Sequence, residues 1–172
     1  DVSNVMNGDY SLTVTMVALG SPVNIADAST WSDAQPAHAN AHYVIPATGN
    51  LRGQTGTSTF PGTSLKVEAG GKFQVRSLES DGETTTVDDL ILAGGAGFGS
   101  GQFAQLAAGT GTNATNVLEG TITQSGATRL STNGGSINRS LIINSQISGS
   151  GMQQSTGAGV TITNASNTFS GT

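Results

Sequence analysis

The sequence predicts an all-β fold in which short strands stack as the coils of a β-solenoid. Short apolar runs recur in the last third of the chain between Gly, Ser, Thr and Asn, with a loose period of about 20 to 25 residues that is typical of solenoid repeats. Ile122 and Ile147 lie one long period apart in the similar phrases TITQSG and SQISGSG, and Ile142 and Ile162 lie one shorter period apart. Charged residues make up only 10% of the chain while Val, Ile and Thr are plentiful, which favours strands over disorder.

The composition excludes several kinds of protein. The 172 residues suffice for one domain, and a formal net charge of −5 without a basic patch argues against a nucleic-acid partner. No apolar run has the length of a membrane-spanning helix. The absence of Cys excludes a disulfide framework and a thiolate metal site. Because the sequence begins with Asp1 and shows no signal peptide, we expect a processed product, a fragment or a sequence without its leader.

Residues 9–19, DYSLTVTMVAL, form the clearest predicted strand. Tyr10, Leu12, Val14 and Met16 alternate with Ser and Thr, so one face of this strand is apolar. The strand either caps the core of its own chain or pairs with another subunit. Capping is favoured, because terminal strands commonly just close a sheet.

An irregular segment follows the first strand. Residues 21–40 show no apolar period, and we expect Trp31 to anchor them on the core. A short strand, YVI, is expected at 43–45. The predicted organisation is therefore an N-terminal strand and irregular segment over 1–30, followed by a β-solenoid domain over 31–172.

The coil pattern begins near residue 59. The phrases LKVE, FQVR and LIL alternate or run apolar and end at glycines, and Leu65 and Leu90 are separated by the same long period as Ile122 and Ile147. No stretch combines helical periodicity with helix caps. The predicted core consists of Leu65, Val67, Leu90, Leu92, Ile122, Leu141, Ile143, Ile147, Val160 and Ile162.

Six segments show a similar repeat pattern: STWSDAQPAHANAHYVI, TFPGTSLKVEAGGKFQVRS, VDDLILAGG, LEGTITQSG, LIINSQISGSG and VTITNASNTFSGT. They resemble the autotransporter-associated β-strand repeat of very large bacterial surface proteins. The resemblance covers roughly residues 30–172 and implies a right-handed parallel β-helix, exported to the bacterial cell surface or outside the cell. It brings no catalytic residue and no cofactor with it. Residues 1–30 do not match the repeat.

Two groups of residues are weighed as metal ligands. His38 and His42 flank Ala-Asn-Ala, and an i, i+4 pair on a helix could hold zinc, but Pro36 indicates a loop and a third ligand is missing. Oxygen-rich loops bind calcium, yet the one acidic cluster has neither EF-hand nor β-roll spacing. We therefore expect a solvated turn and no metal. The acidic cluster consists of Asp81, Glu83, Asp88 and Asp89.

The remaining sequence features do not predict an enzyme. The run GGAGFGSG over Gly94–Gly101 does not fit a phosphate-binding loop, and its glycines are expected to allow positive φ angles. Six basic residues are scattered along the chain. Lys66 and Arg76 could approach each other on neighbouring strands, but no set of groups meets the requirements of a catalytic site. A β-helix polysaccharide lyase or hydrolase stays the third hypothesis.

The leading hypothesis is an extracellular structural protein, a subunit of a bacterial surface fibre or matrix that self-associates into a homopolymer. A solenoid has two open ends, and soluble repeat proteins cover them with polar caps, whereas the last coil here carries no charge and no Pro. Assembly is expected through these ends or by strand exchange. The alternative is a fragment of a large adhesin that binds surface glycans. The predicted assembly residues are Tyr10, Leu12, Val14, Met16, Val160, Ile162 and Phe169.

Overall fold

The computed structural model describes residues 12–76, 83–109, 114–132, 139–157 and 159–172. Over these residues the chain is all-β with parallel sheets and has no α-helix, as the sequence predicts. A short 3₁₀-helix, η1 (Ala28–Thr30), lies in the irregular N-terminal segment.

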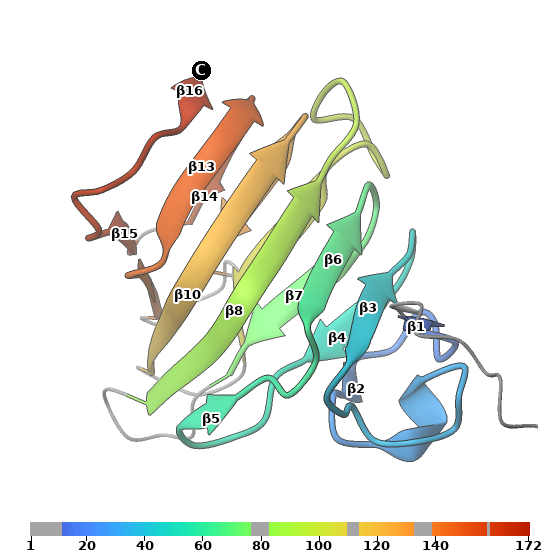
Figure 1. Cartoon of the computed structure of the whole chain (residues 1–172). Coiled ribbons are helices and arrows are strands. Elements are labelled where there is room, and N and C mark those ends of the chain that lie inside the picture. Colours follow the sequence, from blue (N-terminus) through green and yellow to red (C-terminus); the bar gives the residue numbers. More distant parts are fainter. Residues whose placement is uncertain (1–11, 77–82, 110–113, 133–138, 158) are drawn as a thin grey trace, which may run out of the picture.

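The strands form two parallel sheets, one behind the other (Figure 1). The main path of the larger sheet runs β1 (Leu12–Thr15), β3 (Ala41–Ile45), β6 (Ser64–Glu68), β8 (Glu83–Ala93), β10 (Thr115–Ser125), β12 (Ser140–Ile143) and β15 (Val160–Ile162). Beside this path lie β5 (Ser58–Thr59), β13 (Gln146–Gly151) and β16 (Ser170–Gly171). The smaller sheet runs β14 (Gln153–Thr156), β11 (Thr128–Ser131), β9 (Ala104–Ala108), β7 (Lys72–Val75), β4 (Asn50–Arg52) and β2 (Val23–Asn24).

The chain alternates between the two sheets, so each round up to β14 adds strands to both, and the last round adds β15 and β16 to the larger sheet. This arrangement is consistent with a β-solenoid, and we call it the coil stack. Each coil is too thin to bury its own apolar side chains, and stacking on the next coil buries them.

The strand register confirms the longer of the two predicted spacings. Leu65 pairs with Leu90, and Ile122 pairs with Ile147. The predicted match of Ile142 with Ile162 is wrong, because Ile162 pairs with Ile143, the next residue along β12. Neighbouring residues of a strand point to opposite faces, so Ile143 is buried whereas Ile142 points outward.

The core is built of rows of side chains that run along the stack. The longest row passes through six successive strands in register, and its members are Val14, Tyr43, Leu65, Leu90, Ile122 and Ile147. All of them are buried, as are Val67, Leu92, Leu141 and Ile143, so eight of the ten predicted core residues are confirmed. The exceptions are Val160, which is half-buried, and Ile162, which is exposed because β15 is the last strand of its path.

The first strands continue both sheets. β1 pairs with β3 and β2 pairs with β4, so the described part of residues 1–30 lies on the first coil of its own chain. Val14 and Met16 are buried there. Tyr10 lies outside the described residues. The domain boundary at residue 30 and the pairing of β1 with another subunit stay predictions.

The glycines of the run at 94–101 mainly allow the backbones of neighbouring coils to come close together, and few of them adopt positive φ angles. Within it only Gly101 has a positive φ, 74°. A Cβ on Gly94 would overlap the carbonyl oxygen of Ala127 on the next coil. The backbone bond from Ala127 N–H to the carbonyl of Gly95, 2.8 Å, holds the two coils at this distance. The expectation of positive φ is therefore wrong for most of this run.

Candidate functional site

The large apolar side chains that stay exposed among the described residues lie at the two ends of the coil stack. Leu12, Val17 and Leu19, in the first coil, are 47%, 54% and 53% exposed. Ile162, in the last coil, is 40% exposed. Exposure of scattered apolar residues is ordinary, but their concentration at both ends marks these ends as candidate contact surfaces.

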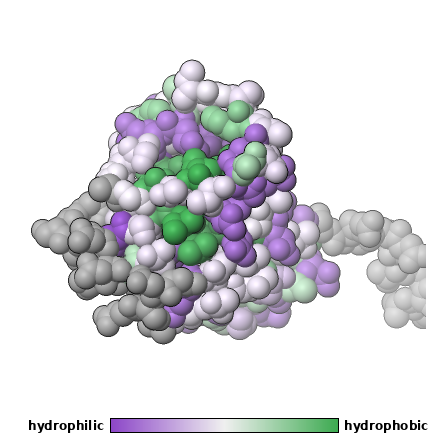
Figure 2. Space-filling model, turned by 90° about the vertical axis from the view of Figure 1, so that its left-hand side faces the viewer, coloured by the Kyte–Doolittle hydropathy of each residue, from purple (hydrophilic) through white to green (hydrophobic). Residues whose placement is uncertain are grey.

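The C-terminal end is open. Figure 2 faces this end and shows an apolar area bordered by hydrophilic residues. Val160 and Phe169 are partly buried against the core, and Ile162 is the last member of the row Thr85, Leu118, Ile143, Ile162. Within the described residues no strand pairs with the outer edge of β15 or β14.

Polar side chains hold the last coil in place. Asn144 accepts a hydrogen bond from Asn164 Nδ2 at its carbonyl oxygen (3.0 Å), and its side-chain oxygen accepts one from Thr163 Oγ1 (3.1 Å). Asn167 Oδ1 accepts the backbone N–H of Ile147 at 2.8 Å. This coil is therefore attached by a ladder of amides and hydroxyls, and its apolar side chains lack a cover.

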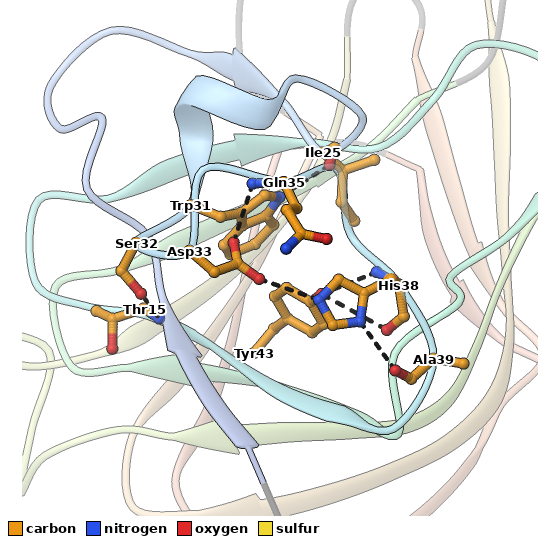
Figure 3. Close-up of polar contacts among 9 residues, drawn as sticks. All are labelled: Thr15, Ile25, Trp31, Ser32, Asp33, Gln35, His38, Ala39 and Tyr43. Carbon is orange, nitrogen blue, oxygen red and sulfur yellow. Dashed lines mark hydrogen bonds and ion pairs between the residues drawn. The ribbon is translucent and has the colours of Figure 1, made fainter.

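The N-terminal end is partly covered by residues 21–40, which we call the cap segment. Trp31 is buried; its Nε1 donates to the carbonyl of Ile25 at 3.0 Å, and its ring meets the Tyr43 ring edge-on at 4.7 Å between centroids (Figure 3). The backbone N–H of Ser32 donates to the carbonyl of Thr15 at 2.9 Å, on the outer side of β1. The prediction that Trp31 anchors this segment is confirmed.

His38 fastens the cap segment through both ring nitrogens. Nε2 lies 3.0 Å from Asp33 Oδ2 and Nδ1 lies 2.9 Å from the carbonyl oxygen of Ala39 (Figure 3). Both partners are acceptors, and only the protonated imidazolium can donate to both at once. The hydrogen bonds to Ala39 and Asp33 accordingly raise the pKa of His38 above 6.5.

The other weighed residues have separate partners. His42 Nδ1 lies 2.7 Å from Ser64 Oγ, away from the partners of His38. Glu83 Oε2 accepts the backbone N–H of Gly56 at 3.2 Å, and Asp81 lies outside the described residues. Within the described parts of the chain, no three His, Asp or Glu side chains are grouped as metal ligands.

The predicted approach of Lys66 and Arg76 is wrong. Lys66 lies on β6 of the larger sheet and pairs with Glu68 at 3.0 Å, whereas Arg76 follows β7 of the smaller sheet. Arg76 Nη1 instead donates to Asn24 Oδ1 at 3.3 Å. The sequence could not show this separation, because two strands that follow each other in the chain, β6 and β7, lie in different sheets.

The fold and its ends define an all-β protein of parallel, solenoid-like architecture. Comparison with protein-family models, with curated proteins and with solved structures gives no match to this chain. Among the described residues, no helix is long and apolar enough to cross a membrane. The resemblance to the autotransporter-associated repeat therefore stays a prediction.

Proposed function

We propose that this chain is an extracellular structural subunit of a bacterial surface fibre or matrix, built as a right-handed parallel β-helix that associates end to end. The observation that carries the proposal is the position of the exposed apolar side chains at the two ends of the coil stack. The right-handed coil is supported by a general rule, because connections between parallel strands of one sheet are almost always right-handed.

The two ends differ, which favours a head-to-tail contact. At the open C-terminal end, the core row that finishes at Ile162 lacks its next member. At the other end, Leu12 presents an apolar side chain beside the cap segment. A second copy whose N-terminal end, formed by Leu12 and the cap segment, meets the last coil would cover Ile162. Repetition of this contact generates a filament, because a head-to-tail contact does not close a dimer.

Charge substitution at the open end tests the proposal. Lysine on a strand edge opposes pairing with another strand. We expect the sedimentation coefficient of the wild type to rise with protein concentration and that of Ile162→Lys to stay at the monomer value. Thr123→Lys is the matched control, because Thr123 is exposed in the middle of the larger sheet, on β10. Wild-type protein that stays monomeric, or an Ile162→Lys variant that assembles like the control, contradicts the proposal.

A further inference from the structure

The strands of the smaller sheet carry basic side chains and no carboxylate. This sheet lies behind the larger sheet in Figure 1, so its outer face points away from it. Its strands contain neither Asp nor Glu, whereas Arg52, Lys72 and Arg129 lie on β4, β7 and β11. Basic residues that are scattered along the sequence therefore lie together on one sheet. The strands of the larger sheet hold carboxylates instead, which are Glu68, Glu83, Asp88, Asp89 and Glu119.

One row of side chains on this outer face alternates between amides and cations. The register pairs successive members across β4, β7, β9, β11 and β14. In the first four of these strands the next residue is buried in the core, so the members of the row point outward. Each member is half-buried, and its polar end reaches solvent. We call this set the amide–cation row, and its members are Asn50, Lys72, Gln105, Arg129 and Gln154.

The amide–cation row presents mainly hydrogen-bond donors. Arg129 Nε donates to Gln154 Oε1 at 3.1 Å, and the guanidinium lies 3.8 Å from the centroid of the Phe103 ring. These two contacts fix the orientation of the guanidinium. Among the described residues, no protein group bonds the Nη atoms of Arg129, the ammonium of Lys72 or the amide of Gln105. The row therefore suits a ligand that is rich in acceptor oxygens.

The positive charges of this face are not balanced by neighbouring carboxylates. Within the described parts of the chain, the side-chain ion pairs are Lys66 with Glu68 and His38 with Asp33, and neither lies on the smaller sheet. Partial burial and the positive charge of Arg52 lower the pKa of Lys72. An anion bound on this face would therefore reduce a repulsion between cations.

The spacing of the cations indicates which kind of anion fits. β9 lies between β7 and β11, so Lys72 and Arg129 are about 9.5 Å apart along the row. A nucleic-acid strand carries one phosphate about every 3.4 Å. An extended acidic peptide can carry one carboxylate about every 3.3–3.6 Å. Both would place more negative charges on the row than it has cations. A polysaccharide with a carboxylate on every second sugar has wider spacing, and hydroxyls lie between its charges.

We propose that the outer face of the smaller sheet binds a linear acidic polysaccharide that carries a carboxylate on alternate sugars. The polymer lies along the amide–cation row, parallel to the axis of the coil stack. Lys72 and Arg129 each bind one carboxylate, and Gln105 bonds to hydroxyls of the sugar between them. This binding does not depend on end-to-end association, because the whole row belongs to one copy of the chain.

Binding of hyaluronate oligosaccharides to the intact chain, measured by calorimetry at low and high salt, tests the proposal. Hyaluronate carries glucuronate on alternate sugars. Carboxyl-reduced hyaluronate keeps the sugars without the charge, whereas polyglutamate and single-stranded DNA carry an anion on every unit. We expect hyaluronate to bind about tenfold or more tightly than each of these three polymers. Its affinity should fall as salt rises, because salt screens the contacts between charges.

Two single variants locate the binding face. Lys72→Gln and Arg129→Gln each remove one cation and keep an amide, and we expect each to lower the affinity for hyaluronate about fivefold. The double variant should lower it about 25-fold, because effects at separated positions add in free energy. Lys66→Gln is the matched control. It removes the same charge on β6 of the larger sheet and should bind like wild type.

A third variant separates loss of binding from loss of folding. Gln105→Glu places a carboxylate of nearly the same shape between the two cations and occupies them from within the chain. We expect it to abolish hyaluronate binding without lowering the melting temperature, because opposite charges on neighbouring strands stabilise a sheet.

Four results would overturn the proposal. The first is absence of hyaluronate binding by the wild type. The second is equal binding of carboxyl-reduced hyaluronate, polyglutamate or DNA, which would mean that the carboxylate spacing is not recognised. The third is a loss of affinity in Lys66→Gln as large as in Lys72→Gln, which would mean that only net charge matters. The fourth is self-association of Ile162→Lys that Gln105→Glu abolishes, which would assign the face to the carboxylates of a second copy. Sedimentation of the wild type without polysaccharide tests the proposed function separately.

Discussion

At the scale of the residue, His38 shows how one side chain fixes the cap segment. Its ring donates to a carboxylate and to a backbone carbonyl, and this pairing is complete only in the protonated form. From the sequence, His38 and His42 were considered as a pair of zinc ligands, which would require them to lie on a helix. The helix is absent from this described segment, and each imidazole has its own partner.

The first prediction follows from the raised pKa of His38. A pKa that is higher in the folded state contributes stability below the unfolded value, near 6.5, and that contribution is lost as pH rises through the folded value. Denaturant unfolding of wild type and His38→Gln at pH 5.5 and pH 8.5 measures it. The stability difference between the two proteins should be larger at pH 5.5. An equal difference at both pH values would mean that protonation of His38 does not hold the cap.

The second prediction concerns Gly94. Because a methyl at this position overlaps the backbone of Ala127, Gly94→Ala must push two coils apart, at a cost of about 1–3 kcal/mol. Gly97 has open surroundings except for the side chain of Gln102, so Gly97→Ala should stay within about 0.5 kcal/mol of wild type. Urea unfolding of the two variants compares them. Equal stability would show that the coils at Gly94 are farther apart.

At the scale of the element, the repeat spacing predicts the strand pairs correctly where coils have equal length. The pairs Leu65 with Leu90 and Ile122 with Ile147 both follow from the longer predicted spacing. The spacing fails at both ends, where the step from Leu12 to Ala41 is longer and the step from Ile143 to Ile162 is shorter. It also fails in the middle of the stack, where the step from Leu90 to its partner Ile122 is longer. Turns made of polar residues can differ in length at little cost in free energy. The strand register between coils joined by such turns therefore cannot be predicted from a constant repeat length.

The third prediction compares three isoleucines of the stack. Ile122 and Ile147 are 1% and 3% exposed, so truncation of either to Ala should cost about 2–5 kcal/mol. Ile162→Ala should cost less, about 1 kcal/mol in the monomer, because 40% of this side chain stays exposed to water. Chemical denaturation at low protein concentration measures all three. A large cost for Ile162 alone would mean that the last coil packs more tightly than described.

The candidate sites differ in how far sequence predicts them. The apolar alternation around Leu12 and the uncharged last coil indicated the ends. Val17 and Leu19 were missed because they lie after Met16, where the apolar alternation within residues 9–19 stops. An apolar pocket lined by the cap segment, the loops on either side of β5 and strands β5, β7 and β8 was not predictable, because only the stacking of coils brings these parts together.

At the scale of the whole molecule, stability and assembly are expected to need no bound ion. The fourth prediction is that a chelator leaves melting temperature and sedimentation unchanged, because Glu83 bonds to the backbone of Gly56 and the described residues hold no group of three possible metal ligands. A marked fall in melting temperature with EDTA would contradict this and implicate Glu83, Asp88 and Asp89, since loss of a bound ligand lowers stability.

The central claim is that subunits stack along the axis of their own coils. X-ray diffraction from oriented fibres of the protein measures this directly, because neighbouring parallel strands lie about 4.7–4.9 Å apart along that axis. We expect a reflection at about this spacing on the meridian, parallel to the fibre, and its loss from preparations of Ile162→Lys. The same reflection on the equator would mean that subunits associate through their sides, and would contradict the end-to-end arrangement.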